Sequence, residues 1–317
     1  MKHLLSFRVY ESQTSSGLTP EQEAFLNRYI RKGGTWSVNP TTGLVDIQGD
    51  FFPDNDGLKN FLGIKFGNVT GVFNCSNNQL QSLKGAPQEV NGNFYCENNQ
   101  LQSLKGAPRK VGGYFNCSHN LLQSLAGAPQ EVVGDFDCYS SQLKSLAGAP
   151  REVGGHFDCS YNHLQSLEGA PQKIGGHFSC AGNKLQSLEG APQKVDGDFV
   201  CSHNHYQLKS LEGAPKQIDG TFECDEFRLE VGEWNPKGWL EVLRTGYIKA
   251  KKLILTLPYL QPDWWNSELQ RDPGKTVHFL APWWKDMPED MKSKIKIPSG
   301  YENELDLFSG FDEMGLF

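Results

Sequence analysis

Eight cysteines are the residues of this 317-residue chain with the most varied possible chemistry, since thiols form disulfides and bind zinc. Their spacing indicates neither. Six successive steps are 21 residues and the last is 23 residues, at Cys75, Cys96, Cys117, Cys138, Cys159, Cys180, Cys201 and Cys224. A constant period of this length predicts a solenoid, in which each coil repeats one structural unit.

Stacked cysteines are poor disulfide partners in such a solenoid. Neighbouring parallel strands lie about 4.8 Å apart, whereas the Cβ atoms of a disulfide lie about 3.8 Å apart. We therefore expect buried, reduced thiols that pack as small apolar side chains. Reduced thiols are typical of the cytoplasm, so the sequence predicts a cytoplasmic protein.

A second group of candidate residues flanks the cysteines. In the recurring Phe-x-Cys, period two places Phe and Cys on one side of a strand and their neighbours on the other. These outward neighbours vary from coil to coil while the framework repeats, which suits a binding surface. The predicted protein-binding residues are Tyr95, Tyr114, Asp135, Asp137, Tyr139, His156, Asp158, His177 and Asp198.

Three interpretations of these residues stay open. Tyrosines supply rigid aromatic area of the kind that anchors protein interfaces. His156 and His177 with their flanking aspartates are also residue types that hold a divalent metal, although a flat row suits tetrahedral geometry poorly. Charge pairing on an ordinary solvated sheet would produce the same pattern. We expect a protein contact, with neither a metal nor another cofactor.

Motifs of common enzymes are missing from the sequence. It has no Gly-x-Gly-x-x-Gly or Walker-type phosphate loop, no Gly-x-Ser-x-Gly and no His-Glu-x-x-His. The net charge of -7 argues against a nucleic-acid partner, which needs a basic stripe. No apolar run is long enough to predict a membrane span. We therefore expect a non-enzymatic protein with neither a nucleic-acid nor a membrane partner.

The repeat unit must position these side chains. Each cysteine is preceded by Val or Ile at six residues, Gly at four and Phe at two, and is usually followed by Asn, Leu-x-Ser-Leu and Gly-Ala-Pro. We expect one short parallel strand per coil around Phe-x-Cys and an extended or polyproline-like opposite side. Phe, Cys and Leu should fill the interior, and the asparagines should bond backbone groups at the turn.

This unit resembles the leucine-rich repeat of the short bacterial type. Phe94, Cys96, Asn99 and Leu101 occupy the last four positions of that signature, whereas the first leucine is missing. The resemblance implies a repeat solenoid of about nine coils over residues 45–229. The start MKHLLSFRVYES, the segment TWSVNPTTGLVDIQGDF and the repeats together resemble leucine-rich-repeat proteins encoded by tailed bacteriophages, which implies a bacterial host cytoplasm.

A solenoid needs closed ends, because one coil cannot bury its own apolar side chains. Residues 1–44 are predicted to form an α/β N-terminal cap, with a helix over residues 19–30 and a hairpin over residues 36–47. Phe51 and Pro53 match the Phe and Cys positions of a degenerate first coil.

Residues 230–317 differ in kind from the repeats. They hold six of the seven tryptophans, and we expect a small, mostly helical C-terminal domain with a helix near residues 249–257. The acidic, apolar tail from Tyr301 either docks onto a partner or folds back on its own domain.

The outward residues favour a module that binds a protein with a basic patch, toward which the aspartates would steer it. Two alternatives remain. The chain is a virion or assembly component in which the solenoid acts as a spacer, or it is an enzyme whose activity resides in the C-terminal domain, with His278 as the candidate.

Overall fold

The structure is a computed structural model that describes residues 16–204, 208, 213–225 and 252–256, with single positions and short runs between residues 266 and 301. Helix α1 (Pro20–Tyr29) begins at Thr19, whose hydroxyl accepts a hydrogen bond from the Gln22 amide. The Gln22 side chain accepts one from the Thr19 amide in return. Strands β1 (Thr35–Val38) and β2 (Val45–Gln48) follow as an antiparallel hairpin. The predicted cap helix and hairpin are confirmed.

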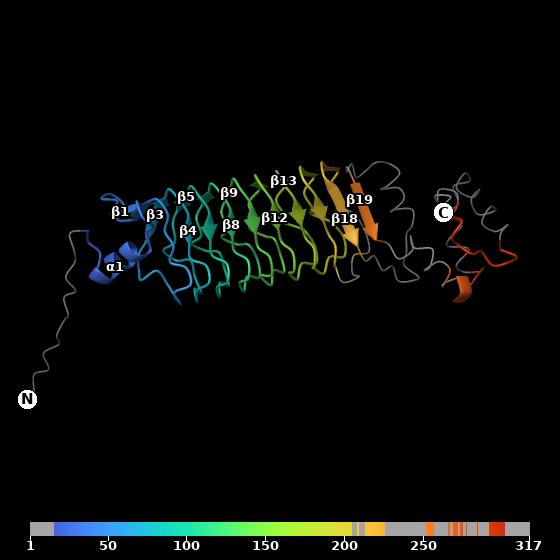
Figure 1. Ribbon diagram of the computed structural model, residues 1–317, viewed down its shortest axis with the longest axis horizontal. Helices are drawn as coiled ribbons and strands as arrows, with labels where there is room; N and C mark the ends of the chain where they lie inside the picture. The colour runs from blue at the N-terminus through green and yellow to red at the C-terminus, as the bar shows by residue number, and fades with distance from the viewer. Residues whose placement is uncertain are drawn as a thin grey trace, which may run out of the picture. The chain divides into compact units, whose positions relative to one another are not determined.

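The chain then winds into a parallel β-solenoid of about eight turns with a spacing of about 21 residues (Figure 1). Each turn contributes a strand to each of two sheets. The valine sheet continues from β1 and β2 through β3 (Phe66–Val69), β5 (Glu89–Val90), β7 (Lys110–Val111), β9 (Glu131–Val132), β11 (Glu152–Val153), β13 (Lys173–Ile174), β15 (Lys194–Val195) and β17 (Gln217–Ile218). The phenylalanine sheet contains β4 (Phe73–Asn74), β6 (Phe94–Tyr95), β8 (Phe115–Asn116), β10 (Phe136–Asp137), β12 (Phe157–Asp158), β14 (Phe178–Ser179), β16 (Phe199–Val200), β18 (Thr221–Asp225) and β19 (Lys252–Thr256).

Two local expectations need correction. The repeat predicts one strand per coil, whereas the recurring Val or Ile forms a second strand on the side expected to be extended, as where Val111 pairs with Val132. The helix predicted near residues 249–257 is wrong, because Lys252–Thr256 is strand β19 next to β18 in the sheet order. Its run of aliphatic and β-branched residues suits a strand.

Phenylalanine rings stack in register through the interior. Phe136 pairs with Phe115 on one side and with Phe157 on the other. Successive rings between Phe73 and Phe222 have centroids 5.0–5.6 Å apart. Phe51 bridges Phe73 in parallel, which confirms the degenerate first coil.

The cysteines form a buried column beside these rings. All eight carry free thiols, as predicted. The Cys75 thiol donates to Tyr95 O of the next coil at 3.3 Å, and the same contact recurs from coil to coil. Burial raises the pKa of the thiols from Cys75 to Cys180, so these groups stay protonated and unreactive.

A column of buried asparagines joins each coil to the one before it. Asn120 Nδ2 donates to Cys96 O at 3.0 Å, to Cys117 O at 3.0 Å and to Ser118 O at 3.2 Å. Its Oδ1 accepts from the Leu101 amide at 3.0 Å. The predicted role of the asparagines is therefore confirmed, and one amide side chain satisfies backbone groups of two coils.

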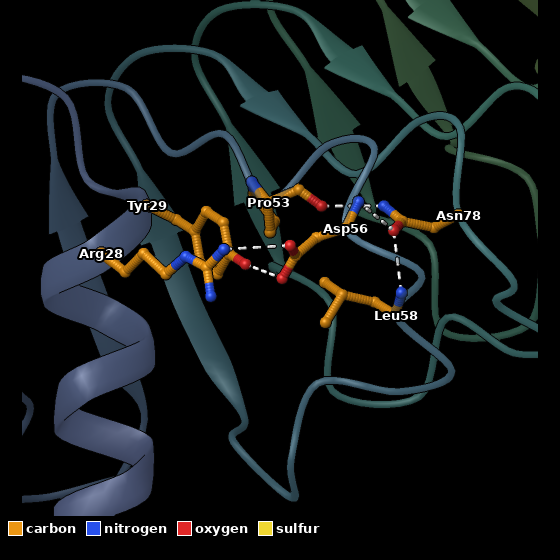
Figure 2. Close-up of polar contacts among 6 residues, drawn as sticks. All are labelled: Arg28, Tyr29, Pro53, Asp56, Leu58 and Asn78. Atoms are coloured by element: carbon orange, nitrogen blue, oxygen red, sulfur yellow. Dashed lines mark hydrogen bonds and ion pairs between the residues drawn. The ribbon is translucent and has the colours of Figure 1, made fainter.

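The first coil makes the same contacts without a cysteine and links them to the cap. Asn78 Nδ2 donates to Pro53 O at 2.8 Å, and its Oδ1 accepts from the Asp56 amide at 3.1 Å. The Asp56 carboxylate pairs with Arg28 Nη2 at 3.1 Å and accepts from the Tyr29 hydroxyl (Figure 2). Burial and this hydrogen bond raise the pKa of Tyr29 to about 12. Helix α1 thus closes the end of the stack.

The C-terminal region forms a separate unit. Its buried apolar side chains among the described residues are Leu269, Val277 and Ile295. Most of the predicted helical domain, His278 and the acidic tail lie outside the described residues. In the part of the chain that is described, no helix is both long and apolar enough to cross a membrane. The chain divides into two compact units, residues 1–224 with 229–254 and residues 225–228 with 255–317.

Candidate binding surface

The predicted binding residues lie on the outer side of the phenylalanine sheet, which we call the acidic face. It comprises the side chains three and one residues before and one residue after each cysteine. The Phe and Cys between these positions are buried, and most of the flanking side chains are not. From Val72 to Glu223 these positions include no Lys or Arg. Their acidic residues are Glu97, Asp135, Asp137, Asp158, Asp198 and Glu223.

The histidine and aspartate row, three residues before each cysteine, caps backbone amides of the next coil. Asp135 Oδ1 accepts from the His156 amide at 2.7 Å. His156 Nδ1 accepts from the His177 amide at 2.7 Å, and the two rings stack with centroids 4.4 Å apart. His177 Nδ1 then accepts from the Asp198 amide at 2.7 Å. These side chains therefore stabilise the corner between the two sheets.

The Nδ1 atoms of His156 and His177 each accept a hydrogen bond from a backbone amide, and this bears on metal binding. The lone pair of an Nδ1 that accepts an N–H points at that amide, so neither Nδ1 is free to bind a metal. His177 Nδ1 also lies 3.2 Å from Asp198 Oδ2, farther than its 2.7 Å contact with the Asp198 amide. Within the described ranges, no group of three His, Cys, Asp or Glu side chains is placed to hold a metal.

The glycine four residues before each cysteine leaves room for this row. A Cβ on Gly155 would lie 2.0 Å from Asp135 Oδ1, and one on Gly176 would lie 2.4 Å from His156 Nδ1. Side-chain acceptors can approach the backbone this closely only where no Cβ intervenes. The recurring glycine thus serves the side chain of the preceding coil.

Two of the predicted tyrosines form one rigid cluster. The rings of Tyr95 and Tyr114 meet edge to face with centroids 5.7 Å apart. Asn93 Nδ2 donates to the Tyr95 hydroxyl at 2.9 Å, and the Tyr114 hydroxyl donates to Asp137 Oδ2 at 2.7 Å. Burial and this hydrogen bond raise the pKa of Tyr114, so its phenol stays protonated. The cluster presents aromatic area that needs little ordering on binding.

Tyr139 belongs to a second aromatic group that the sequence pattern did not reveal. Its ring lies 5.3 Å from His119 and 5.2 Å from Tyr161 between centroids. Tyr161 is 53% exposed and has a φ of 54°, a left-handed conformation that disfavours a bulky residue. A Cβ on Gly182 would lie 2.9 Å from the Tyr161 ring, so this glycine makes room for it. The sequence did offer one signal for this group: Gly182 is the single glycine in the column two residues after each cysteine, which otherwise holds larger residues.

Two carboxylates of the acidic face are partly withdrawn from water. Burial raises the pKa of Asp158 despite the opposing hydrogen bond from the Ser160 amide at 2.8 Å. Burial also raises the pKa of Glu97, which the sequence interpretation did not select. Glu97 Oε2 is buried and has no hydrogen-bond partner among the described residues. Burial therefore disfavours the charged form of both carboxylates, and no cation of the described residues pairs with either of them.

The outer side of the valine sheet, which we call the mixed face, contrasts with this arrangement. Its side chains seven and eight residues before each cysteine carry both signs of charge. Its cross-coil ion pairs join Arg109 to Glu89 at 2.7 Å, Lys110 to Glu131 at 2.7 Å and Lys173 to Glu152 at 3.6 Å.

Comparison of the chain with protein-family models, with curated proteins and with solved structures finds no match. The chemistry of the two faces is therefore the basis for a functional conclusion.

Proposed function

We propose that the protein is a non-enzymatic binding module that holds a protein partner with a basic patch on its acidic face. The observation that carries this proposal is the contrast between the two faces. The mixed face joins most of its charges in its own ion pairs, whereas the acidic face gathers carboxylates and tyrosines without a Lys or Arg in its columns.

A basic partner would supply what the acidic face lacks. A lysine or arginine placed near Glu97 Oε2 would give that buried oxygen a charged donor. The rings of Tyr95, Tyr114, Tyr139 and Tyr161 would add apolar area and faces over which a cation is attracted. The remaining aspartates would increase the rate of encounter by long-range attraction.

We place this interaction in a reducing compartment, the cytoplasm, because the buried thiols form no disulfide and a reducing setting keeps them so. The resemblance of the repeats to leucine-rich-repeat proteins of tailed bacteriophages would make the partner a protein of a bacterial host.

Affinity capture from bacterial lysate with three forms of the chain tests the proposal. The forms are the wild type, Asp137→Lys with Asp158→Lys on the acidic face, and Glu131→Lys with Glu152→Lys on the mixed face. Both variants add the same charge. We expect basic proteins captured by the wild type and by the mixed-face variant but lost from the acidic-face variant.

Direct titration of each captured protein then measures the effect. Replacing two carboxylates by lysines should weaken binding by about a hundredfold or more, since attraction turns into repulsion. Equal recovery by all three forms would refute the proposal, and so would capture of acidic proteins alone.

A further inference from the structure

A third row of exposed side chains follows the Gly-Ala-Pro turns and belongs to neither face. It consists of the residue nine positions after each cysteine from Cys75 to Cys180, directly before the turn glycine, and we call it the turn row. The corresponding Glu212 of the next coil lies outside the described residues. Its members are all exposed and read, in chain order, Lys84, Lys105, Ala126, Ala147, Glu168 and Glu189. Charge therefore changes from positive to negative along the row, with two uncharged residues at its centre.

The backbone holds the turn row in register. A serine two residues earlier accepts a hydrogen bond from the amide of the row residue, at 3.1 Å for Lys84 and Lys105 and at 3.0 Å for Ala147. The next glycine packs on the preceding coil, where a Cβ on Gly106 would lie 2.7 Å from Leu83 O. Row residues in adjacent coils are therefore spaced by about 4.8 Å, the distance between parallel strands.

Among the described residues, the charges of the turn row form no ion pair. Across the described ranges, ion pairs form at the cap, on the mixed face, beside it and at His177, but none involves a charged member of this row. An ordered line of unpaired charges that reverses sign about its midpoint is complementary to itself when turned end for end.

We propose that the turn row is an interaction surface for a second copy of this chain, docked antiparallel. A two-fold axis would pass between Ala126 and Ala147, which is the usual symmetry of a self-complementary contact. Lys84 of one copy would then face Glu189 of the other. A parallel arrangement would place lysine against lysine and glutamate against glutamate.

The inner pair follows from the same axis. Lys105 faces Glu168, the two alanines face each other across the axis, and symmetry repeats both ion pairs. The small central side chains let the two turn rows approach closely. The contact is distinct from the acidic face, so the proposal does not depend on the proposed function.

A neighbouring exposed row is compatible with this register. Thirteen residues after each cysteine from Cys75 to Cys180, at the edge of the mixed face, lie glutamines interrupted by Arg151 and by Arg109, which also pairs with Glu89. In the antiparallel arrangement Arg109 faces Gln172, and Arg151 faces Gln130. No like charges meet there, which would not hold for an arbitrary distribution of arginines.

The expected affinity is low. Exposed ion pairs contribute about 0.2–1 kcal/mol each, and a contact along six turns is smaller than a standard interface. We expect a weak, transient dimer that forms at high protein concentration and at low ionic strength.

Sedimentation velocity over a concentration series tests the charge pairing. Lys84→Glu with Lys105→Glu, and separately Glu168→Lys with Glu189→Lys, should each raise the dissociation constant by about tenfold or more. The fourfold variant exchanges the signs and should restore association. A wild type that stays monomeric at every concentration would overturn the proposal, as would double variants that associate normally or a fourfold variant that does not recover.

Cysteine cross-linking tests the orientation without altering a charge. Gln81 lies in the same coil as Lys84, and Gln186 lies in the same coil as Glu189. In the antiparallel dimer Gln81 of one copy would therefore face Gln186 of the other, and both side chains are exposed. A mixture of Gln81→Cys and Gln186→Cys chains should form an intermolecular disulfide on oxidation, while the native thiols stay buried. Chains with Gln81→Cys alone should not, because their thiols would be about five coils, roughly 24 Å, apart. Cross-linking of Gln81→Cys with itself and not with Gln186→Cys would overturn the antiparallel arrangement.

Discussion

The acidic face and the mixed face are built on the same 21-residue repeat, yet their charges are arranged differently. The mixed face pairs charges of both signs, whereas the acidic face has carboxylates and no Lys or Arg in its columns. On the mixed face, Lys110 and Glu131 in adjacent coils pair at 2.7 Å. On the acidic face, the carboxylates of Asp158 and Glu97 are partly buried, and no cationic side chain of the described residues pairs with them. The difference therefore lies in which side chains the two sheets present.

This contrast separates the positions that the packing of the coils requires from the positions at which the side chain can vary. The buried Phe, Cys, Leu and Asn columns are nearly constant because each coil must fit its neighbours. Charges on the mixed face add a little to that fit. The partly buried carboxylates Asp158 and Glu97 on the acidic face oppose it, so the fit between coils does not account for these two groups.

The largest expected effect comes from breaking the framework beneath both faces. Asn120→Ala removes hydrogen bonds to three carbonyls and one amide and should destabilise the protein by about 3 kcal/mol. Ser141 occupies the same column but makes only two side-chain bonds, at 3.2 and 3.3 Å. Ser141→Ala should therefore cost about 1 kcal/mol in urea unfolding. Equal losses would show that the column is not what joins the coils.

A smaller effect is expected from loosening the acidic face itself. Tyr114→Phe keeps the ring but leaves Asp137 without its hydroxyl donor, which should cost about 1–1.5 kcal/mol in thermal or urea unfolding. Tyr95→Phe removes a neutral hydrogen bond with Asn93 and should cost about half as much. If Tyr114→Phe were neutral, the tyrosine cluster would not be preorganised by its hydroxyl groups.

Neutralising a withdrawn carboxylate should stabilise the protein. Folding raises the pKa of Asp158, so the folded state resists its ionisation and the charge lowers stability above that folded pKa. The loss should vanish as the pH falls through the folded pKa toward the unfolded value of about 4. Asp158→Asn keeps an acceptor for Ser160 and should raise the melting temperature at pH 7 by about one to three degrees, but not at pH 3. An equal shift at both pH values would assign the gain to packing.

The smallest effect is expected on the mixed face, with the opposite sign. Glu131→Gln removes an exposed ion pair with Lys110 and should lower stability at pH 7 by about 0.5 kcal/mol or less. Salt at high concentration should erase this loss. If Glu131→Gln and Asp158→Asn changed stability in the same direction, the distinction between the two faces would fail.

The architecture was largely predictable because the same residue pattern recurs in successive coils. The cysteine period and Phe-x-Cys alternation indicated stacked parallel strands, and Thr19 to Gln22 indicated the start of α1. Two-residue strands such as Lys110–Val111 carry no alternation, so the valine sheet was missed. Strand β19 was mistaken for a helix because short aliphatic runs suit either structure until a neighbouring strand is available.

The candidate surface was predictable only in part. Period two placed Tyr95, Tyr114 and Asp137 correctly on the outer side of the sheet. It did not reveal that His156 would bond a backbone amide, since that contact depends on the corner between two sheets. Tyr161 escaped notice because its column lies in a left-handed turn, where alternation along a strand no longer applies.

The thiol column gives the molecule an internal measure of cooperativity. Each regular coil carries one buried cysteine, so an alkylating reagent can reach it only when that coil opens. Brief labelling followed by peptide mass spectrometry would then yield an opening free energy for every coil without any introduced probe. Stacked repeats behave as a chain of nearest-neighbour units, so these energies would show how far a defect spreads from either end.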